Sequence, residues 1–199
     1  NNVFIKDWFI SFCKIIDNNW IKNSNLDLEE IPRNKANYII KWTIPKNFKI
    51  HSNLILKSEK KFEISNVYEF YGDQYADIQF QITSLNLFKK FKKNNTYFET
   101  SLSANGSSNK REISNYIRID SFISKKIGKY PHKKIFISQI ESDKNPNYDL
   151  TLLPNTISPY DKSFYHEIKV LKAYLSNYLN EKILVDRRND YWVHEGILT

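Results

Sequence analysis

Three residues in the last third of the chain have side chains that could perform metal chemistry. His166 and Glu167 are adjacent, and Glu195 follows 29 positions after His166. Two histidines four residues apart on a helix can bind zinc, the glutamate after the first one can activate a water, and a later carboxylate can complete the ligand set. The position of the second histidine is occupied by Val170. Because valine has no lone pair to donate, the pattern predicts a site that has lost a metal ligand.

The segment after Ser158-Pro159 is predicted to form the helix that carries His166, since serine can cap a helix and proline fits its first position. Its apolar residues recur at helical spacing and predict one buried face: Phe164, Ile168, Leu171, Leu175 and Leu179. Successive helical residues are ~100° apart, so His166 and Val170 are expected together on roughly the opposite side. Ala173 lies beside them, which predicts that this second side is also covered.

The rest of the chain is predicted to form strands, then a helix and a further strand. Strand-like alternation marks residues 38–44, 52–56, 68–71 and 76–82, and it ends near residue 84. The basic run Lys89–Lys93 is interpreted as a solvated turn before a strand at 96–102. A helix is predicted from Asn109 to a stop at Gly128, followed by a strand at 134–140. The buried stripe of that helix is predicted to be Ile113, Tyr116, Ile119, Ile123 and Ile127.

Composition indicates a globular protein with a sizeable core. The chain has 199 residues, of which 41% are hydrophobic and 15% aromatic, which suits one large domain or parts of two. It contains no methionine and begins at Asn1 inside an apolar, aromatic run, so we expect a fragment of a longer protein. No apolar run reaches the ~18 residues that span a bilayer. Cys13 is the single cysteine and cannot form an internal disulfide.

The formal charge of +8 would favour acidic partners if it were concentrated on one face. The basic residues are scattered along the sequence, however, and no nucleic-acid-binding motif accompanies them. A nucleic-acid partner is therefore not expected.

The order of elements in the last seventy residues resembles a known family. This part of the chain is similar to the aminopeptidase N-like zinc metallopeptidases, which are gluzincins. The similarity lies in the succession of Gly128-Lys129-Tyr130-Pro131, a strand, a loop, a helix with His-Glu and then Trp192-x-x-Glu195-Gly196. In that family a β-sandwich domain precedes a thermolysin-like catalytic domain. The resemblance implies an α+β fold: residues 1–84 would be the C-terminal strands of an N-terminal β-sandwich domain, and residues 85–199 a partial thermolysin-like catalytic domain.

By this resemblance His166 would be the first zinc ligand, Glu167 the general base and Glu195 the third ligand. The separation between His166 and Glu195 is longer than is usual in the family, which implies an insertion within residues 179–189. His194 could replace the missing ligand only through a non-helical turn, since neighbouring helical residues point in different directions. The loop at 145–150 offers no glutamate in place of the one with which the family holds a free amino terminus.

Two functions follow from the resemblance. The first is a degenerate, non-catalytic metallopeptidase homologue with a cleft for a peptide or protein, in which the family's zinc is lost or weakly held. The alternative is an active zinc-dependent aminopeptidase with an atypical ligand set. Aromatic residues could line a peptide groove, although ordinary packing explains each one singly: Tyr148, Tyr160, Tyr165 and Trp192. Glu167 could instead form an ion pair with Lys169 or Lys172, or with Arg187 or Arg188. The family suggests an exported or cell-envelope location.

Overall fold

The computed structural model describes residues 2–6, 15–20, 34–103, 109–140, 162–182 and 191–198, except for the side chains at positions 16, 162, 163, 191, 194 and 195. The chain forms two compact units. The first unit contains Asn1–Asn86, Leu179–Ile197 and Thr199, and the second contains Leu87–Tyr178 and Leu198. The assignment of residues 1–84 and 85–199 to two domains of a longer protein stays a prediction.

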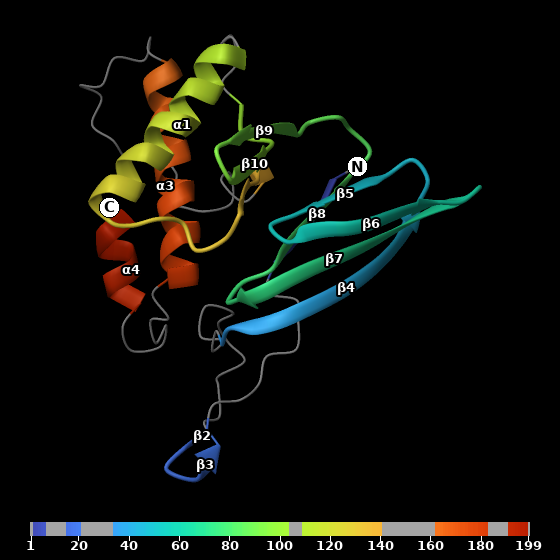
Figure 1. The fold of residues 1–199 in the computed structure, drawn as a ribbon, viewed down its shortest axis with the longest axis horizontal. Helices are drawn as coiled ribbons and strands as arrows, with labels where there is room; N and C mark the ends of the chain where they lie inside the picture. Colours follow the sequence, from blue (N-terminus) through green and yellow to red (C-terminus); the bar gives the residue numbers. More distant parts are fainter. Residues whose placement is uncertain are drawn as a thin grey trace. The chain divides into compact units, whose positions relative to one another are not determined.

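The described residues of the first unit form two three-stranded antiparallel sheets, a small hairpin and most of helix α4 (Tyr191–Leu198). One sheet has the order β1-β8-β5 and the other β4-β7-β6, while β2 pairs with β3. The strands, shown in blue to green in Figure 1, are β1 (Asn2–Lys6), β2 (Ile15–Ile16), β3 (Asn19–Trp20), β4 (Ala36–Pro45), β5 (Lys49–Ser52), β6 (Ile55–Lys61), β7 (Ser65–Tyr75) and β8 (Gln79–Thr83).

Alternation along these strands places one face of each sheet in a shared apolar core. In β7 every second side chain from Asn66 to Phe70 is buried, as the period of two in an extended strand requires. Residues of both sheets meet in one cluster: Ile44, Ile50, Leu54, Tyr68, Phe70, Tyr75, Ile78 and Phe80. The strands predicted at 38–44, 68–71 and 76–82 are therefore confirmed, with β7 and β8 differing at their ends.

The strand predicted at 52–56 is wrong, because the chain bends there between β5 and β6. Asn53 donates its side-chain amide to the Asp77 carbonyl at 2.7 Å and accepts the Gln79 amide at 2.9 Å. The Leu54 amide bonds the Ser52 hydroxyl at 3.1 Å. Polar side chains thus form hydrogen bonds with backbone groups in place of strand pairing, and the strand is interrupted here.

A glutamate in the last turn of α3 (Lys162–Lys182) belongs to the first unit. The Glu181 carboxylate accepts the backbone amide of Ala76 at 2.9 Å and that of Asp77 at 3.1 Å, in the loop between β7 and β8. All three groups are buried. One carboxylate therefore satisfies two consecutive amides that would otherwise lack partners away from water.

The second unit combines a mixed sheet with two helices. Its sheet has the order β11-β10-β9, in which β10 (Thr96–Thr100) is parallel to β11 (Lys134–Ile137) and antiparallel to β9 (Lys89–Lys93). Parallel neighbours need a long crossover, and α1 (Asn109–Lys126) supplies it. Helices α1 and α3 lie side by side (Figure 1) and are joined by a hydrogen bond of 2.8 Å from the Tyr174 hydroxyl to Asp120.

The predicted helix and strands of this unit are confirmed, but two details differ. Helix α1 ends at Lys126, just before the predicted stop at Gly128, whose φ of 147° lies in a region that favours glycine. Tyr116, Ile119 and Ile123 are buried, whereas Ile127 is 52% exposed because it lies beyond the last helical residue.

The predicted turn at Lys89–Lys93 is wrong, since these residues form β9. Its central Phe91 stacks on Phe98 of β10 with ring centroids 4.8 Å apart. Lysines on both faces of the strand form ion pairs: Lys89 pairs with Glu112, and Lys90 pairs with Glu99 at 3.1 Å. Within the described part of the chain, no helix is both long and apolar enough to span a membrane.

Candidate functional site

His166 lies on helix α3. The side of α3 that is most deeply buried is not the side that the sequence predicted as its main apolar face. The predicted face begins at Phe164, which is 42% exposed, and its middle residues are only partly buried. The opposite side is the more deeply buried, and it contains His166, Val170, Ala173, Tyr174 and Asn177. Small and aromatic residues make this side suitable for close packing against α1, while Asn177 donates to the Phe136 carbonyl at 2.9 Å. The expectation that this second side is covered is therefore confirmed.

His166 is buried against α1 and the end of β10. Its ring meets the edge of Tyr116 with centroids 6.0 Å apart, and Nε2 lies 3.4 Å from the Leu102 carbonyl oxygen. Nδ1 has no hydrogen-bond partner among the described residues. The Tyr116 hydroxyl is itself fixed, because it bonds Thr100 at 2.7 Å and the Leu102 carbonyl at 3.1 Å. The imidazole is thus held by the packing of its own unit.

Burial lowers the pKa of His166, and the Leu102 carbonyl and Glu112 only partly oppose this effect. A histidine with a lowered pKa in the folded state binds fewer protons there than in the unfolded chain. Its contribution to stability is therefore present above the ordinary pKa of about 6.5 and is lost as the pH falls below it.

We expect the free energy of unfolding to fall between pH 7.5 and pH 5, and to fall less in a His166→Phe variant. Urea denaturation at several pH values measures the difference. His132→Phe, which removes the other histidine of the second unit, controls for the loss of an imidazole. Equal pH dependence in the wild-type protein and His166→Phe would contradict the assignment.

Glu167 forms an ion pair with Arg118 of α1. The partners suggested by the sequence were nearby lysines or Arg187 and Arg188, and the latter two lie outside the described residues. Arg118 precedes Glu167 by 49 positions, so no local pattern could have indicated it. The guanidinium holds the carboxylate that would have to accept a proton from a water.

The position of the missing ligand is fully buried. Val170 is 0% exposed, and it offers no donor atom. Glu195 lies in α4 (Tyr191–Leu198), but its carboxylate is outside the described side chains, as is that of His194. Among the side chains that are described, no three His, Cys, Asp or Glu residues group as a metal site requires. Among the described side chains of α3, His166 is therefore the one residue at a position that zinc would use as a ligand, and the predicted pair of His166 and Glu195 stays a prediction.

The burial of the Glu112 carboxylate was not predicted from the sequence. Glu112, in the first turn of α1, accepts the Ser103 hydroxyl at 3.0 Å and pairs with Lys89. Its spacing from Asn109 suggested a helix start, which is confirmed. The pairing with β9 could not be predicted, because it depends on the strand's position against the helix.

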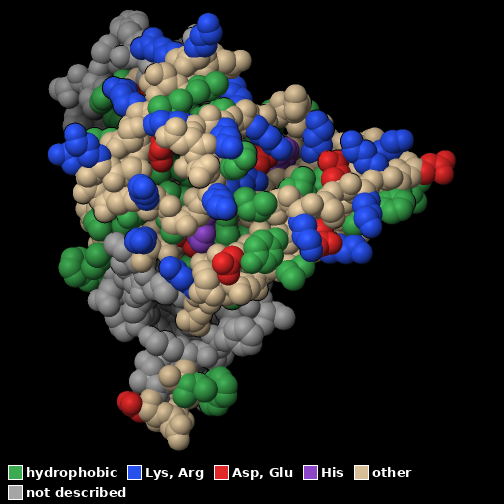
Figure 2. Space-filling view, viewed as in Figure 1, with side chains coloured by type: hydrophobic (Ala, Val, Ile, Leu, Met, Phe, Trp, Pro, Cys, Tyr) green, Lys and Arg blue, Asp and Glu red, His purple; other side chains and the backbone are tan. Residues whose placement is uncertain are grey.

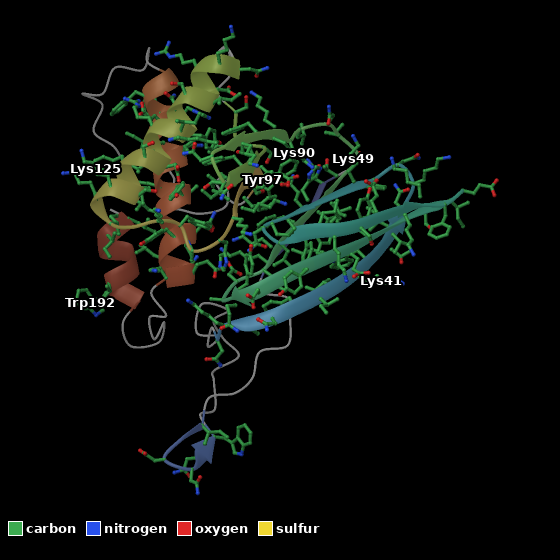
Figure 3. All side chains as sticks on the ribbon, in the orientation of Figure 1. Lys41, Lys49, Lys90, Tyr97, Lys125 and Trp192 are labelled. Carbon is green, nitrogen blue, oxygen red and sulfur yellow. The ribbon has the colours of Figure 1, made fainter. Side chains whose placement is uncertain are left out.

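Two of the four aromatic residues proposed to line a groove have described side chains. Tyr165 is partly buried, and Trp192 is 71% exposed (Figure 3). Tyr148 and Tyr160 lie outside the described residues, together with the loop predicted at 145–150. The peptide groove therefore stays a prediction.

The described fold is α+β: antiparallel sheets in one unit, and a mixed sheet with two helices in the other. It is similar to the crystal structure of a mutant M1 zinc metallopeptidase from Deinococcus radiodurans, with a TM-score of 0.52 and 13% sequence identity. The similarity covers 84% of this chain and 40% of that chain. No protein family model and no curated protein sequence matches the chain. This similarity concerns the fold. It agrees with the broad family that the sequence was found to resemble.

Proposed function

We propose that this protein is a degenerate homologue of zinc metallopeptidases that does not hydrolyse peptides but binds a peptide or another protein. Support for the homologue comes from the fold, which is similar to that of an M1 zinc metallopeptidase. Support for the loss of chemistry comes from α3, where His166 and Glu167 stand in the order that zinc hydrolysis would use but Val170 occupies the position of the second histidine.

The observation that carries the proposal is the full burial of Val170. A valine at an exposed position could leave room for a water or a residue from elsewhere to complete the ligand set. At a buried position its methyl groups occupy that space with neighbouring side chains. The ion pair between Glu167 and Arg118 adds to this, because a general base must be free to accept a proton.

One observation favours the alternative, an active zinc aminopeptidase with an atypical ligand set. Nδ1 of His166 has no partner among the described residues, although the side chain is buried. Buried polar atoms are usually hydrogen-bonded or bound to a metal. Such a site would need at least two further donors from outside the described side chains.

Zinc content and hydrolysis separate the two functions. After dialysis, we expect elemental analysis of the purified protein to find far less than one zinc per chain. With added zinc, we expect no chelator-sensitive hydrolysis of amino-acyl reporter substrates. About one equivalent of zinc together with chelator-sensitive turnover would establish the alternative and overturn the proposal.

Replacement of the missing ligand tests whether α3 retains the inherited geometry. Val170→His is expected to increase zinc affinity, measured by competition with a chromogenic chelator, because it restores two histidines four residues apart. Val170→Asn is the matched control, since it buries a polar group without supplying an imidazole. If Val170→His remains folded by circular dichroism and binds zinc no better than Val170→Asn, the inherited geometry is absent.

A further inference from the structure

The excess positive charge of the protein belongs to one of its two units. Residues 87–178 contain 16 Lys and Arg and 8 Asp and Glu, whereas the rest of the chain contains 14 of each. The net charge of +8 is therefore that of the second unit. Figure 2 shows Lys and Arg side chains widely distributed over the face that it draws, with fewer Asp and Glu.

On one face of the β11-β10-β9 sheet, the lysines are matched by acids from α1. Lys89 pairs with Glu112, and Lys93 lies 4.0 Å from Asp120 and donates to the Ile117 carbonyl at 3.2 Å. Phe91 lies between these two lysines in the strand and contacts Tyr116 of α1, with ring centroids 5.6 Å apart. This face is thus covered and close to neutral.

The opposite face has more lysines than carboxylates. Lys90 and the buried Lys134 share Glu99, at 3.1 Å and 2.6 Å. Lys92 stands over the ring of Tyr97, with Nζ 4.8 Å from the centroid. Glu99 is the one acidic residue in the three strands, and its charge is already shared.

The surface around these residues is accessible. Tyr97 is 47% exposed, the Lys90 side chain is 63% exposed, and Lys92 is exposed as well. Figure 3 shows Lys90 and Tyr97 together on the side of β9 and β10, and Lys125 on the far side of α1. We call Lys90, Lys92 and Tyr97 the basic-aromatic surface.

We propose that the basic-aromatic surface binds an acidic polypeptide segment in extended conformation. Lys90 and Lys92 are two residues apart on one strand, so their side chains project from the same face about 7 Å apart. Alternate carboxylates of an extended peptide have the same spacing. Among the described residues β9 pairs with β10 alone, and an exposed strand edge offers backbone groups that pair with a peptide. A phosphate chain cannot use those backbone groups in this way, which favours a polypeptide over a nucleic acid.

Lysine on an edge strand also discourages unwanted pairing between sheets. That role does not require an exposed tyrosine beside the lysines or an excess of cations over one shared carboxylate. Both features add to attraction for an acidic chain, because the ring supplies contact area and the charges are complementary. This binding is independent of the metal chemistry of α3, so it can fail while the proposed loss of hydrolysis holds, and the reverse.

Fluorescence anisotropy with the full chain and a labelled decapeptide of alternating Glu and Val tests the proposal. We expect binding that weakens between 50 mM and 300 mM salt, as screening requires. Lys90→Glu/Lys92→Glu is expected to weaken binding at least about tenfold, since it reverses two contacting charges. Lys125→Glu/Lys126→Glu makes the same change of net charge on the last turn of α1 and should retain affinity within about twofold.

Tyr97 provides a second measurement that does not depend on charge. Tyr97→Ala is expected to weaken binding, and Tyr97→Phe to preserve most of it, because the ring supplies the contact. Equal loss in the two double variants would mean attraction to overall charge and would overturn the proposal. So would the absence of binding, or tighter binding of a single-stranded oligonucleotide or of anionic vesicles than of the peptide.

Discussion

Glu181→Ala is expected to lower the free energy of unfolding by about 3 kcal/mol, because it leaves two buried backbone amides without acceptors. The carboxylate accepts the amides of Ala76 and Asp77 at 2.9 Å and 3.1 Å, and all these residues are buried. A hydrogen bond from an amide to a charged acceptor is stronger than one between neutral groups. Urea denaturation monitored by tryptophan fluorescence measures the change.

Two variants show whether this effect comes from the two amides. Glu181→Gln keeps one acceptor oxygen but directs an amino group at the second amide, so its loss of stability should be nearly as large. Lys182→Ala changes the next residue, which is exposed, and should alter stability by less than about 0.5 kcal/mol. A small effect of Glu181→Ala, close to that of Lys182→Ala, would show that the loop between β7 and β8 does not depend on this carboxylate.

Tyr116→Ala is expected to destabilise the protein by about 3 to 5 kcal/mol, as removal of a large buried aromatic side chain usually does. The ring lies between β9, β10 and α3, and its hydroxyl bonds Thr100 and the Leu102 carbonyl. Its removal would leave a cavity beside His166. Thermal or urea denaturation measures the loss, and near-ultraviolet circular dichroism reports whether the remaining aromatic packing survives.

Tyr116→Phe separates the ring from its hydroxyl. It keeps the ring contacts and removes the two hydrogen bonds, so we expect a loss of about 1 to 2 kcal/mol. Burial raises the pKa of the Tyr116 hydroxyl well above its ordinary range, so the group remains protonated and can donate throughout neutral pH. If Tyr116→Phe costs as much as Tyr116→Ala, the hydroxyl bonds rather than the packing hold this part of the unit.

Three side chains of the second unit contribute to its packing and also stand at the positions that the family resemblance of the sequence assigns to zinc chemistry. His166 packs on Tyr116, Val170 is fully buried, and Glu167 is paired with Arg118. Each of the three positions has a structural use that does not involve a metal. This is the arrangement expected of a scaffold that has kept its fold after losing a ligand, and it supports the proposed non-catalytic function.

Much of the fold follows from local pattern in the sequence. Alternation predicted β4 and β7, because successive side chains of a strand point to opposite faces. The start of α1 at Asn109 and its end before Gly128 followed from capping residues, whose effects are also local. The absence of a donor at residue 170 is likewise a property of the sequence, since it depends only on the identity of Val170.

Only the tertiary structure decided how these elements meet. The pairing of Glu167 with Arg118 and of Glu181 with the amides of Ala76 and Asp77 joins residues far apart in the chain. The basic run that local composition indicated as a turn became β9, because Phe91 stacks on Phe98 and a neighbouring helix supplies carboxylates for its lysines. Local pattern determines which backbone conformation a segment prefers, whereas burial and charge pairing depend on which segments become neighbours.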